Sequence, residues 1–193
     1  MQGRLPGFQF SLLSGTEEEI IEQLRAQSVD VGLSTLTGKR PEGLQRRELA
    51  RLSMVLLVPE KCGVSAAGDI LGRDRIDLPL ISVPADEPLA RLFQGELQKR
   101  KVDWFPSVEV PGPDIVLRYV AEGFGAGLAF GTPGRVLPRG VRAIPLKGFP
   151  LVVFGALWLG KLSPPGAVFV EEASKLAREL AAKTIPPKCL DQE

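Results

Sequence analysis

The sequence predicts an α/β fold, because short apolar segments alternate with amphipathic segments along most of the chain. The runs LSMVLLV (52–58) and LVVFGALWL (151–159) are typical of buried strands. Residues 88–100 place apolar side chains three or four positions apart, as one face of a helix requires. The 21 glycines and 17 prolines of the 193 residues are spread out and mark many short turns. Strand–helix–strand alternation of this kind favours largely parallel sheets.

The beginning of the chain predicts a strand, a helix and a second strand. We expect strands at Phe8–Leu13 and Val29–Ser34, with a helix over Thr16–Gln27 between them. Thr16 is suited to cap this helix, and Glu19, three residues later, completes a capping box.

The rest of the chain repeats this scheme and ends in a loose tail, Ile185–Glu193. Further strands are expected at Leu52–Val58, Pro79–Val83, Ser107–Val110, Gly127–Phe130, Val141–Pro145 and Leu151–Leu159. Further helices are expected over Pro88–Arg100, Pro113–Gly123 and Val168–Lys183, the last with Phe169, Ala173, Leu176, Ala177 and Leu180 turned inward.

Composition excludes several classes of function. The net charge of +1 argues against electrostatic binding of nucleic acid by the chain as a whole. The absence of histidine removes Ser–His–Asp and Cys–His catalysis and His-ligated zinc. Two cysteines are too few for a disulfide scaffold, and no apolar run is long enough to span a membrane. The N-terminus has no signal-peptide core, so we expect a soluble cytoplasmic chain with no membrane association, cofactor or metal.

Two glycine motifs resemble nucleotide-binding signatures only superficially. Residues 155–161 (GALWLGK) match the start of a P-loop, but Leu162 stands where Ser or Thr is needed and the interior is apolar strand. Residues 123–127 (GFGAG) follow a helix and precede a strand, the reverse of the dinucleotide context. We expect residues 155–161 to be a buried strand that ends in a turn, and residues 123–127 to be a helix end with a turn into a strand.

The charged clusters and the cysteine beside a lysine have ordinary explanations. Glu17–Glu19 lie at a helix start, where the dipole favours carboxylates. The basic groups, Arg46, Arg47 and Arg51 and then Lys99–Lys101, are expected to be solvated surface. Cys62 follows Lys61, which favours thiolate formation, yet no histidine base accompanies it.

One pattern points to ligand binding. Several strand ends and strand-to-helix junctions carry small polar residues, which are Ser14, Gly15 and Thr16, then Thr35 and Thr37, then Ser82 with Asp86, and Pro111, Gly112, Pro113 and Asp114. Free N–H groups at helix starts bind small anions, and ligands of open α/β sheets lie at the carboxyl ends of strands. Each junction alone is explained by capping. Together they suggest one pocket for a small carboxylate or other anion.

The order of these segments resembles the effector-binding (substrate-binding) domain of LysR-type transcriptional regulators. The matching stretches are SLLSGTEEEIIEQLRAQSVDVGL (11–33), the strand Leu49–Pro59, IDLPLIS (76–82) and VLRYVAEGFGAGLAFG (116–131). Each motif is weak by itself, but the ordered set is fairly specific. The resemblance covers roughly residues 5–182.

The resemblance implies a type 2 periplasmic-binding-protein-like fold, with two Rossmann-like lobes joined by two crossover strands and the ligand in the cleft between them. The first lobe would comprise residues 1–59 and 152–193, and the inserted lobe residues 60–151. In the family, the Thr of the Gly-Thr pair often contacts an anionic group of the effector, and Thr16 is the matching position. The expected ligand-binding residues are Gly15, Thr16, Thr35, Ser82, Pro111, Gly112, Asp114, Gly131 and Thr132.

The chain departs from the family pattern in two respects. The winged helix-turn-helix that binds DNA is absent from the sequence, so DNA contact is expected only through such a region elsewhere. The family's first strand and helix have no counterpart before Phe8, and that helix usually helps to form the dimer. A homodimer is nevertheless the expected assembly from the habit of the family.

Three functions are compatible with this sequence. The first is an effector-sensing regulatory domain that binds a small, anionic metabolite to control transcription, without being an enzyme. The second is a solute-binding protein of a transport system on the same fold. The third is a small-molecule enzyme on this scaffold, which without histidine would use Asp, Glu, Lys or Cys as acid and base.

Overall fold

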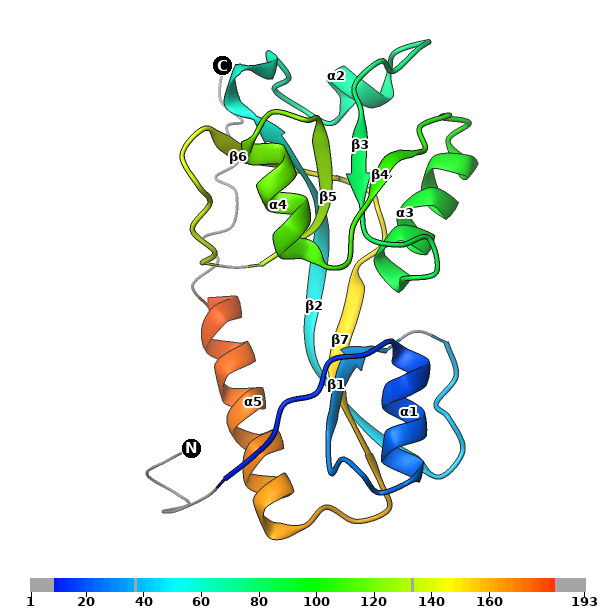
Figure 1. Ribbon diagram of the computed structural model, residues 1–193, viewed down its shortest axis with the longest axis vertical. Coiled ribbons are helices and arrows are strands. Elements are labelled where there is room, and N and C mark those ends of the chain that lie inside the picture. The colour runs from blue at the N-terminus through cyan, green and yellow to red at the C-terminus, as the bar shows by residue number, and fades with distance from the viewer. Residues whose placement is uncertain (1–8, 37, 133, 183–193) are drawn as a thin grey trace. The chain divides into compact units, whose positions relative to one another are not determined.

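The computed structural model describes residues 9–36, 38–132 and 134–182, and the chain divides into two compact units (Figure 1). Unit 1 comprises the described parts of residues 1–51 and 153–193, and unit 2 comprises Leu52–Val152. The sequence-based division placed the boundaries after residues 59 and 151 instead. In the structure Met54–Val58 belong to the buried core of unit 2, which is why the first boundary falls earlier.

Unit 1 is built on a small antiparallel sheet. Strand β1 (Gly32–Thr35) pairs with β7 (Val152–Leu159), so that Thr35 lies opposite Phe154. The next strand in this order is β2 (Leu44–Pro59), whose first half belongs to unit 1. Helix α1 (Glu17–Arg25) packs against β1, and α5 (Pro164–Ala182) lies on the other side of these strands (Figure 1).

The start of α1 confirms the predicted capping box. The Glu19 N–H donates to the Thr16 hydroxyl oxygen (3.3 Å), and the Thr16 N–H donates to Glu19 Oε2 (2.8 Å). Two of the N–H groups that every helix start leaves unpaired are thereby satisfied. Leu24 is the fully buried residue of the helix and anchors it in the small core of unit 1, which also contains Leu44 and Leu157.

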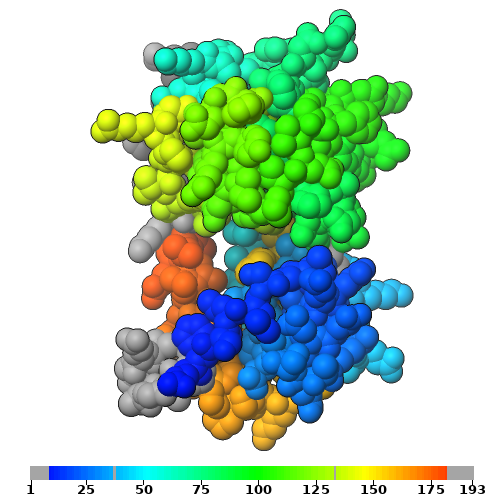
Figure 2. Space-filling model, in the orientation of Figure 1, coloured from blue at the N-terminus to red at the C-terminus, as the bar shows by residue number. Residues whose placement is uncertain are grey.

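The predicted strand at Phe8–Leu13 is wrong for the residues that the structure describes. Residues 9–13 have no regular secondary structure and run along the surface (Figure 2). Phe10, Leu12 and Leu13 are 65%, 82% and 62% exposed, and Phe8 lies outside the described residues. Apolar alternation makes a strand only where a neighbouring strand supplies hydrogen-bond partners, and no described strand pairs with this segment.

Unit 2 contains a mixed sheet rather than the largely parallel one expected. Its strands run in the order β6, β2, β5, β3, β4, where β3 is Leu80–Ser82, β4 is Pro106–Glu109, β5 is Ala126–Gly131 and β6 is Val141–Pro145. The two pairings of β3, with β4 and with β5, are parallel. Strand β2 runs antiparallel to both β5 and β6. The residues of β2 from Met54 to Val58 are all buried, as their unbroken apolar run predicts.

The described residues of unit 2 form four helical segments. Two short ones, η1 (Glu60–Cys62) and α2 (Gly68–Leu71), were not expected from the sequence. The longer ones, α3 (Pro88–Lys99) and α4 (Pro113–Ala121), both begin with proline and pack against β5. Gly123, with φ at +83°, follows α4 and turns the chain toward β5, so the GFGAG motif is a helix end as predicted.

Aromatic side chains organise the core of unit 2. Phe93 is fully buried, stacks on Phe149 with ring centroids 5.6 Å apart and meets the edge of Trp104 at 6.2 Å. The Trp104 indole N–H donates to the carbonyl of Leu78 (2.8 Å), so its polar atom is satisfied inside the core.

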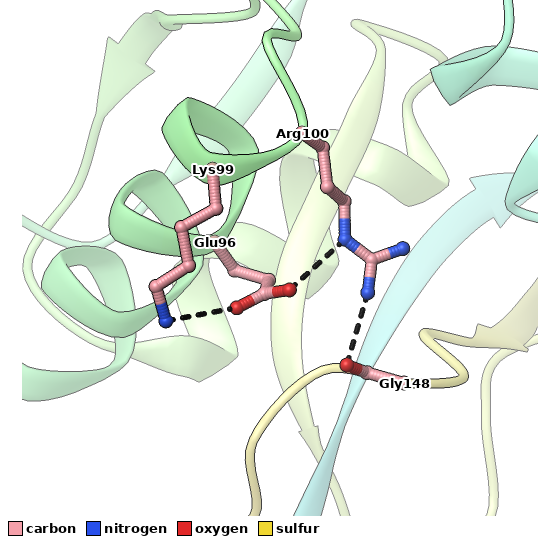
Figure 3. Close-up of polar contacts among 4 residues, drawn as sticks. All are labelled: Glu96, Lys99, Arg100 and Gly148. Carbon is pink, nitrogen blue, oxygen red and sulfur yellow. Dashed lines mark hydrogen bonds and ion pairs between the residues drawn. The ribbon is translucent and has the colours of Figure 1, made fainter.

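The end of α3 is tied to the segment that enters β7. Arg100 donates to Glu96 Oε1 (3.1 Å) and to the carbonyl of Gly148 (2.9 Å), and Lys99 pairs with the same carboxylate (Figure 3). The Arg100 guanidinium also lies 4.4 Å from the centroid of the Phe149 ring. The hydrogen bond that Arg100 donates to Glu96 is the main reason that the pKa of the Glu96 carboxyl lies below its ordinary value. This basic group therefore has a structural role at the surface.

Two further expectations need correction. Strand β2 begins at Leu44, whereas the apolar run predicts a strand from Leu52 and the family resemblance one from Leu49. Residues 45–51 are mostly polar and mostly exposed, so their pattern does not indicate a strand. Helix α5 begins at Pro164, and Leu176 is 56% exposed instead of turned inward. Val170 is the buried apolar residue of this helix, so the covered stripe is narrower than the apolar stripe in the sequence.

Candidate functional site

In unit 1 the structure brings three of the predicted ligand-binding residues to one end. Gly15 and Thr16 lead into α1, and Thr35 is the last residue of β1. Because α1 packs against β1 and runs in the opposite direction, the start of the helix and the end of the strand lie at the same end (Figure 1). Thr16 is exposed and Thr35 is 9% exposed. Thr37 lies outside the described residues.

In unit 2 the other predicted residues gather along one edge of the sheet. Strands β3, β4 and β5 are parallel, so their carboxyl ends share this edge. Ser82 ends β3, Gly112 lies in the loop after β4, and Gly131 ends β5. Ser53 of the antiparallel β2 lies opposite Gly131 and joins the same edge. Pro111 and Thr132 lie in the loops that follow β4 and β5, and Asp114 is the second residue of α4. Asp86 is exposed in the loop before α3.

Ser82 has an unusual environment for a serine. It is 1% exposed, and its hydroxyl has no hydrogen-bond partner among the residues that the structure describes. Its carbonyl accepts from the N–H of Val110 (2.9 Å), which connects β3 to the loop that starts α4. Most buried polar atoms in proteins are hydrogen-bonded, so this hydroxyl is a group that a ligand or water can satisfy.

No side chain of the residues that the structure describes caps the start of α4. Its N-cap residue is Gly112, with φ at +101°, a conformation that glycine adopts readily. A Cβ added at this position would meet no atom of the described residues within 4 Å, apart from its chain neighbours, so the backbone there is open to approach. Uncapped N–H groups at a helix start can donate to a carboxylate or to a neutral acceptor.

Sequence reasoning missed the cation at this edge. Arg135, three residues after Thr132, pairs with Asp114 in the first turn of α4 at 2.7 Å. The Arg135 side chain is 29% exposed and that of Asp114 is 88% exposed. The pairing joins residues 21 positions apart, so no local spacing in the sequence signals it.

Gly131, Thr132 and Arg135 also line a small, mostly apolar cavity in unit 2. Its volume is about 70 Å³, and the remaining lining residues are Val55, Leu57, Ala129, Phe130, Leu137 and Ala143. A cavity that holds a benzene ring measures about 150 Å³, so this one is too small for an aromatic effector. It therefore marks the neighbourhood of Arg135 rather than a complete ligand site.

Other chemistry is sparse among the residues that the structure describes. No group of three or more His, Cys, Asp or Glu residues is placed to hold a metal ion within the ranges 9–36, 38–132 and 134–182. Cys62 is half-buried, unpaired and packed against the core of unit 2. Within the same ranges, no helix is both long enough and apolar enough to cross a bilayer. What the arrangement offers is hydroxyls, main-chain N–H groups and one arginine–aspartate pair.

Solved structures show the same fold. A putative LysR family transcriptional regulator from Pseudomonas aeruginosa matches with a TM-score of 0.73 and 17% identity, over 91% of this chain and 63% of that one. The regulatory domain of Synechocystis CcmR in complex with 2-PG matches with a TM-score of 0.74 and 14% identity, over 92% and 87%. The BenM effector-binding domain with its effector benzoate gives 0.72 and 14%, over 100% and 88%.

These identities are low enough that the structural matches establish the type 2 periplasmic-binding-protein-like fold alone. The chain spans less than two thirds of the length of the Pseudomonas regulator. No curated protein matches the sequence. The family model of the LysR substrate binding domain, in contrast, matches residues 1–175, which is most of the chain. This protein therefore belongs to the LysR substrate-binding domain family.

Proposed function

We propose that this chain is the ligand-sensing part of a LysR-type transcriptional regulator. It binds a small-molecule effector, and the binding changes how a DNA-binding region acts. The observation that carries the proposal is the polar edge of unit 2, where the ends of β3, β4 and β5 meet the uncapped start of α4 in a chain of this family. The fold relatives support it, since BenM binds benzoate and the CcmR regulatory domain binds 2-PG.

The proposed contacts in unit 1 are Gly15, Thr16 and Thr35. Those in unit 2 are Ser82, Pro111, Gly112, Asp114, Gly131 and Thr132, with Arg135 as an addition from the structure. A ligand shifts the equilibrium between two conformations of a protein only when it binds one of them more tightly than the other. Some of these contacts must therefore differ between the two conformations of the regulator. The proposal assigns no catalytic step to the chain. It includes a homo-oligomeric assembly and a cytoplasmic location.

The proposal is tested by a thermal-shift screen of the purified chain with Ser82→Ala beside it. The panel contains small carboxylates, amino acids, their amides and inorganic anions. A bound compound at 100 times its Kd adds about 2.7 kcal/mol of stability. Ser82→Ala removes a hydroxyl without breaking a described hydrogen bond, so we expect the variant to fold normally and to bind the hit more weakly. Ser107→Ala, an exposed serine on β4, is the matched control.

Three results contradict the proposal. A folded chain that responds to no compound in the panel speaks against ligand sensing. A hit that is chemically consumed supports the enzyme alternative instead. A hit that Ser82→Ala and Ser107→Ala affect equally places the ligand away from the polar edge of unit 2.

A further inference from the structure

We propose that the small apolar cavity of unit 2 is a subsite for a short, unbranched alkyl chain, and that Arg135 pairs with a carboxylate carried by the same ligand. The effector therefore carries a saturated aliphatic carboxylate group. This inference rests on the proposed function, which counts Arg135, Asp114 and Thr132 among the ligand contacts. It names the chemical class of the ligand group that these residues bind.

One face of the sheet forms the wall of this cavity. Val55 and Leu57 lie two positions apart on β2, so their side chains project from the same face. Val55 lies opposite Ala129 of β5, and Leu57 lies opposite Ala143 of β6. All four residues line the cavity. The two alanines leave space on this face that larger side chains would fill.

The lining of the cavity suits an alkyl chain better than water. Among the described residues that form it, only Thr132 and Arg135 carry polar side chains. A buried water needs about two to four polar partners, whereas a hydrocarbon chain gains from contact with apolar walls.

The size of the cavity sets the length of that chain. A cavity of about 150 Å³ holds the six carbons of benzene, which corresponds to about 25 Å³ for each carbon atom. The volume of about 70 Å³ beside Arg135 therefore accommodates about three carbon atoms. A propyl group fits this space, and the carboxylate of butyrate would then lie at its charged end.

Arg135 supplies the positive charge at this cavity. Its side chain is 29% exposed and pairs at 2.7 Å with Asp114, whose side chain is 88% exposed. An ion pair with so exposed a partner contributes little to stability, so another carboxylate can replace Asp114 at the guanidinium. A guanidinium also matches the geometry of a carboxylate, with two parallel hydrogen bonds. Asp114 then acts as a competitor that the ligand displaces.

The first test is a series of carboxylates that differ in chain length. Acetate, propionate, butyrate and hexanoate are titrated into the ¹⁵N-labelled chain, with butyramide as the neutral counterpart of butyrate. The amide signals of Gly131 and Thr132, which line the cavity, report binding. Burial of one methylene group is worth about fourfold in affinity. We expect this gain from acetate to propionate and again to butyrate, with no further gain for hexanoate and weaker binding of butyramide.

A second test fills the cavity. Ala143 is exposed on β6, so the variant Ala143→Leu can place a larger side chain at the cavity without breaking the core. We expect this variant to lose the gain in affinity from acetate to butyrate. Ala121→Leu makes the same substitution at an exposed alanine of α4 that does not line the cavity, and it should keep the gain.

A third test changes the charges. Two charges about 4 Å apart at the surface interact with an energy that corresponds to roughly fivefold in affinity. Arg135→Gln should therefore weaken butyrate binding roughly fivefold, and Asp114→Asn should strengthen it by a similar factor because the competing carboxylate is removed. Arg139→Gln, at an exposed arginine of the same loop, is the matched control and should change binding by less than about twofold.

Several results overturn the inference. One is the absence of any shift of the Gly131 and Thr132 signals, and another is an affinity that ignores chain length or still rises at hexanoate. Equal effects of Arg135→Gln and Arg139→Gln overturn it as well. If Ala143→Leu does not fold, the chain-length series and the two arginine variants decide the matter without it.

The inference and the proposed function fail in different experiments. A thermal-shift hit that depends on Ser82, but that Arg135→Gln and Ala143→Leu leave unchanged, removes the alkyl subsite and keeps the sensing function. A folded chain that responds to no compound of the thermal-shift panel removes the sensing function itself.

Discussion

Unit 2 and unit 1 differ in how much apolar surface each one buries. The core of unit 2 is continuous and includes the five buried residues Met54–Val58 and the stacked pair of Phe93 and Phe149. The buried cluster of unit 1 contains Leu24, Leu44 and Leu157, with half-buried neighbours around it. Stability follows buried apolar area, so we expect unit 2 to resist unfolding more strongly than unit 1.

The location of the exposed apolar residues sharpens this comparison. Phe10, Leu12 and Leu13 precede α1 in unit 1 and are mostly exposed, although their chemistry favours burial. The free energy of local opening ranges from about zero in mobile segments up to the global free energy of unfolding in the core. The ligand contacts that we propose for unit 1 thus lie in the unit with the smaller buried core.

The largest expected effect is on the core of unit 2. Phe93→Ala removes a fully buried ring that contacts Phe149 and Trp104, and we expect a loss of about 3–5 kcal/mol in the free energy of unfolding. Urea denaturation measures it. Phe105→Ala, a 69% exposed phenylalanine in the same unit, should cost well under 1 kcal/mol. Similar losses in the two variants would contradict the assignment of the core.

The corresponding change in unit 1 is Leu24→Ala. The cost for a buried leucine is about 2–5 kcal/mol, and we expect the lower part of this range because the cluster around Leu24 is small. Hydrogen exchange should show lost protection in α1 and β1 with protection in β5 retained. Leu33→Ala, a 39% exposed leucine in β1, is the control. Equal loss of protection in both units would mean that they unfold as one.

The capping box supplies a smaller and local contribution. Thr16→Ala removes the hydroxyl that accepts the Glu19 N–H, and we expect a loss of about 1 kcal/mol. Thr16→Ser keeps the acceptor and should restore most of the stability. Amide exchange in the first turn of α1 provides the measurement. A loss that Thr16→Ser does not repair would show that the methyl group, rather than the cap, matters.

The smallest expected effect is the loss, at low pH, of the stability that Asp69 contributes to unit 2. Asp69 accepts the N–H groups of Ala66 (2.8 Å) and Ser65 (2.7 Å), which hold the pKa of its carboxyl below the ordinary value. Its stabilising contribution is therefore present above about pH 4 and is lost as the pH falls through the lowered pKa of the folded state. We expect the difference in the free energy of unfolding between the unmodified chain and Asp69→Ala to shrink as the pH is lowered from about 5 to about 2. These two pH values lie on either side of the ordinary pKa of an aspartate.

The matched control for this titration is Asp86→Ala. Asp86 is an exposed aspartate in the loop before α3. Equal pH dependence in the two variants would argue against the hydrogen bonds of Asp69 as the cause.

Local patterns predicted much of the fold and part of the candidate site. The capping box at Thr16, the proline starts of α3 and α4 and the turn at Gly123 all depend on contacts within a few residues. The burial of Met54–Val58 in β2 was predictable, because five successive apolar residues are rarely stable in contact with water. The site residues at strand ends were proposed because helix starts and small polar residues can be recognised in the sequence, and they remain a prediction.

The remaining features depend on contacts between distant residues. Residues 44–51 of β2 carry no apolar run and form a strand because the order of the sheet places β7 beside them. The opposite failure occurs at residues 9–13, where an apolar alternation has no described strand partner. The pair of Arg135 and Asp114 arises only when the loop after β5 folds back onto the start of α4.

The sequence by itself determined the α/β class, the order of most helices and strands and the family, because these depend on short-range periodicity, capping and ordered motifs. The tertiary structure decided which strands run antiparallel, which apolar residues remain exposed and which charges face one another. It also decided that Glu19 lies against Gly15 while Arg135 lies against Asp114. Strand pairing and charge contacts of this kind depend on the path of the whole chain, and local spacing carries no record of that path.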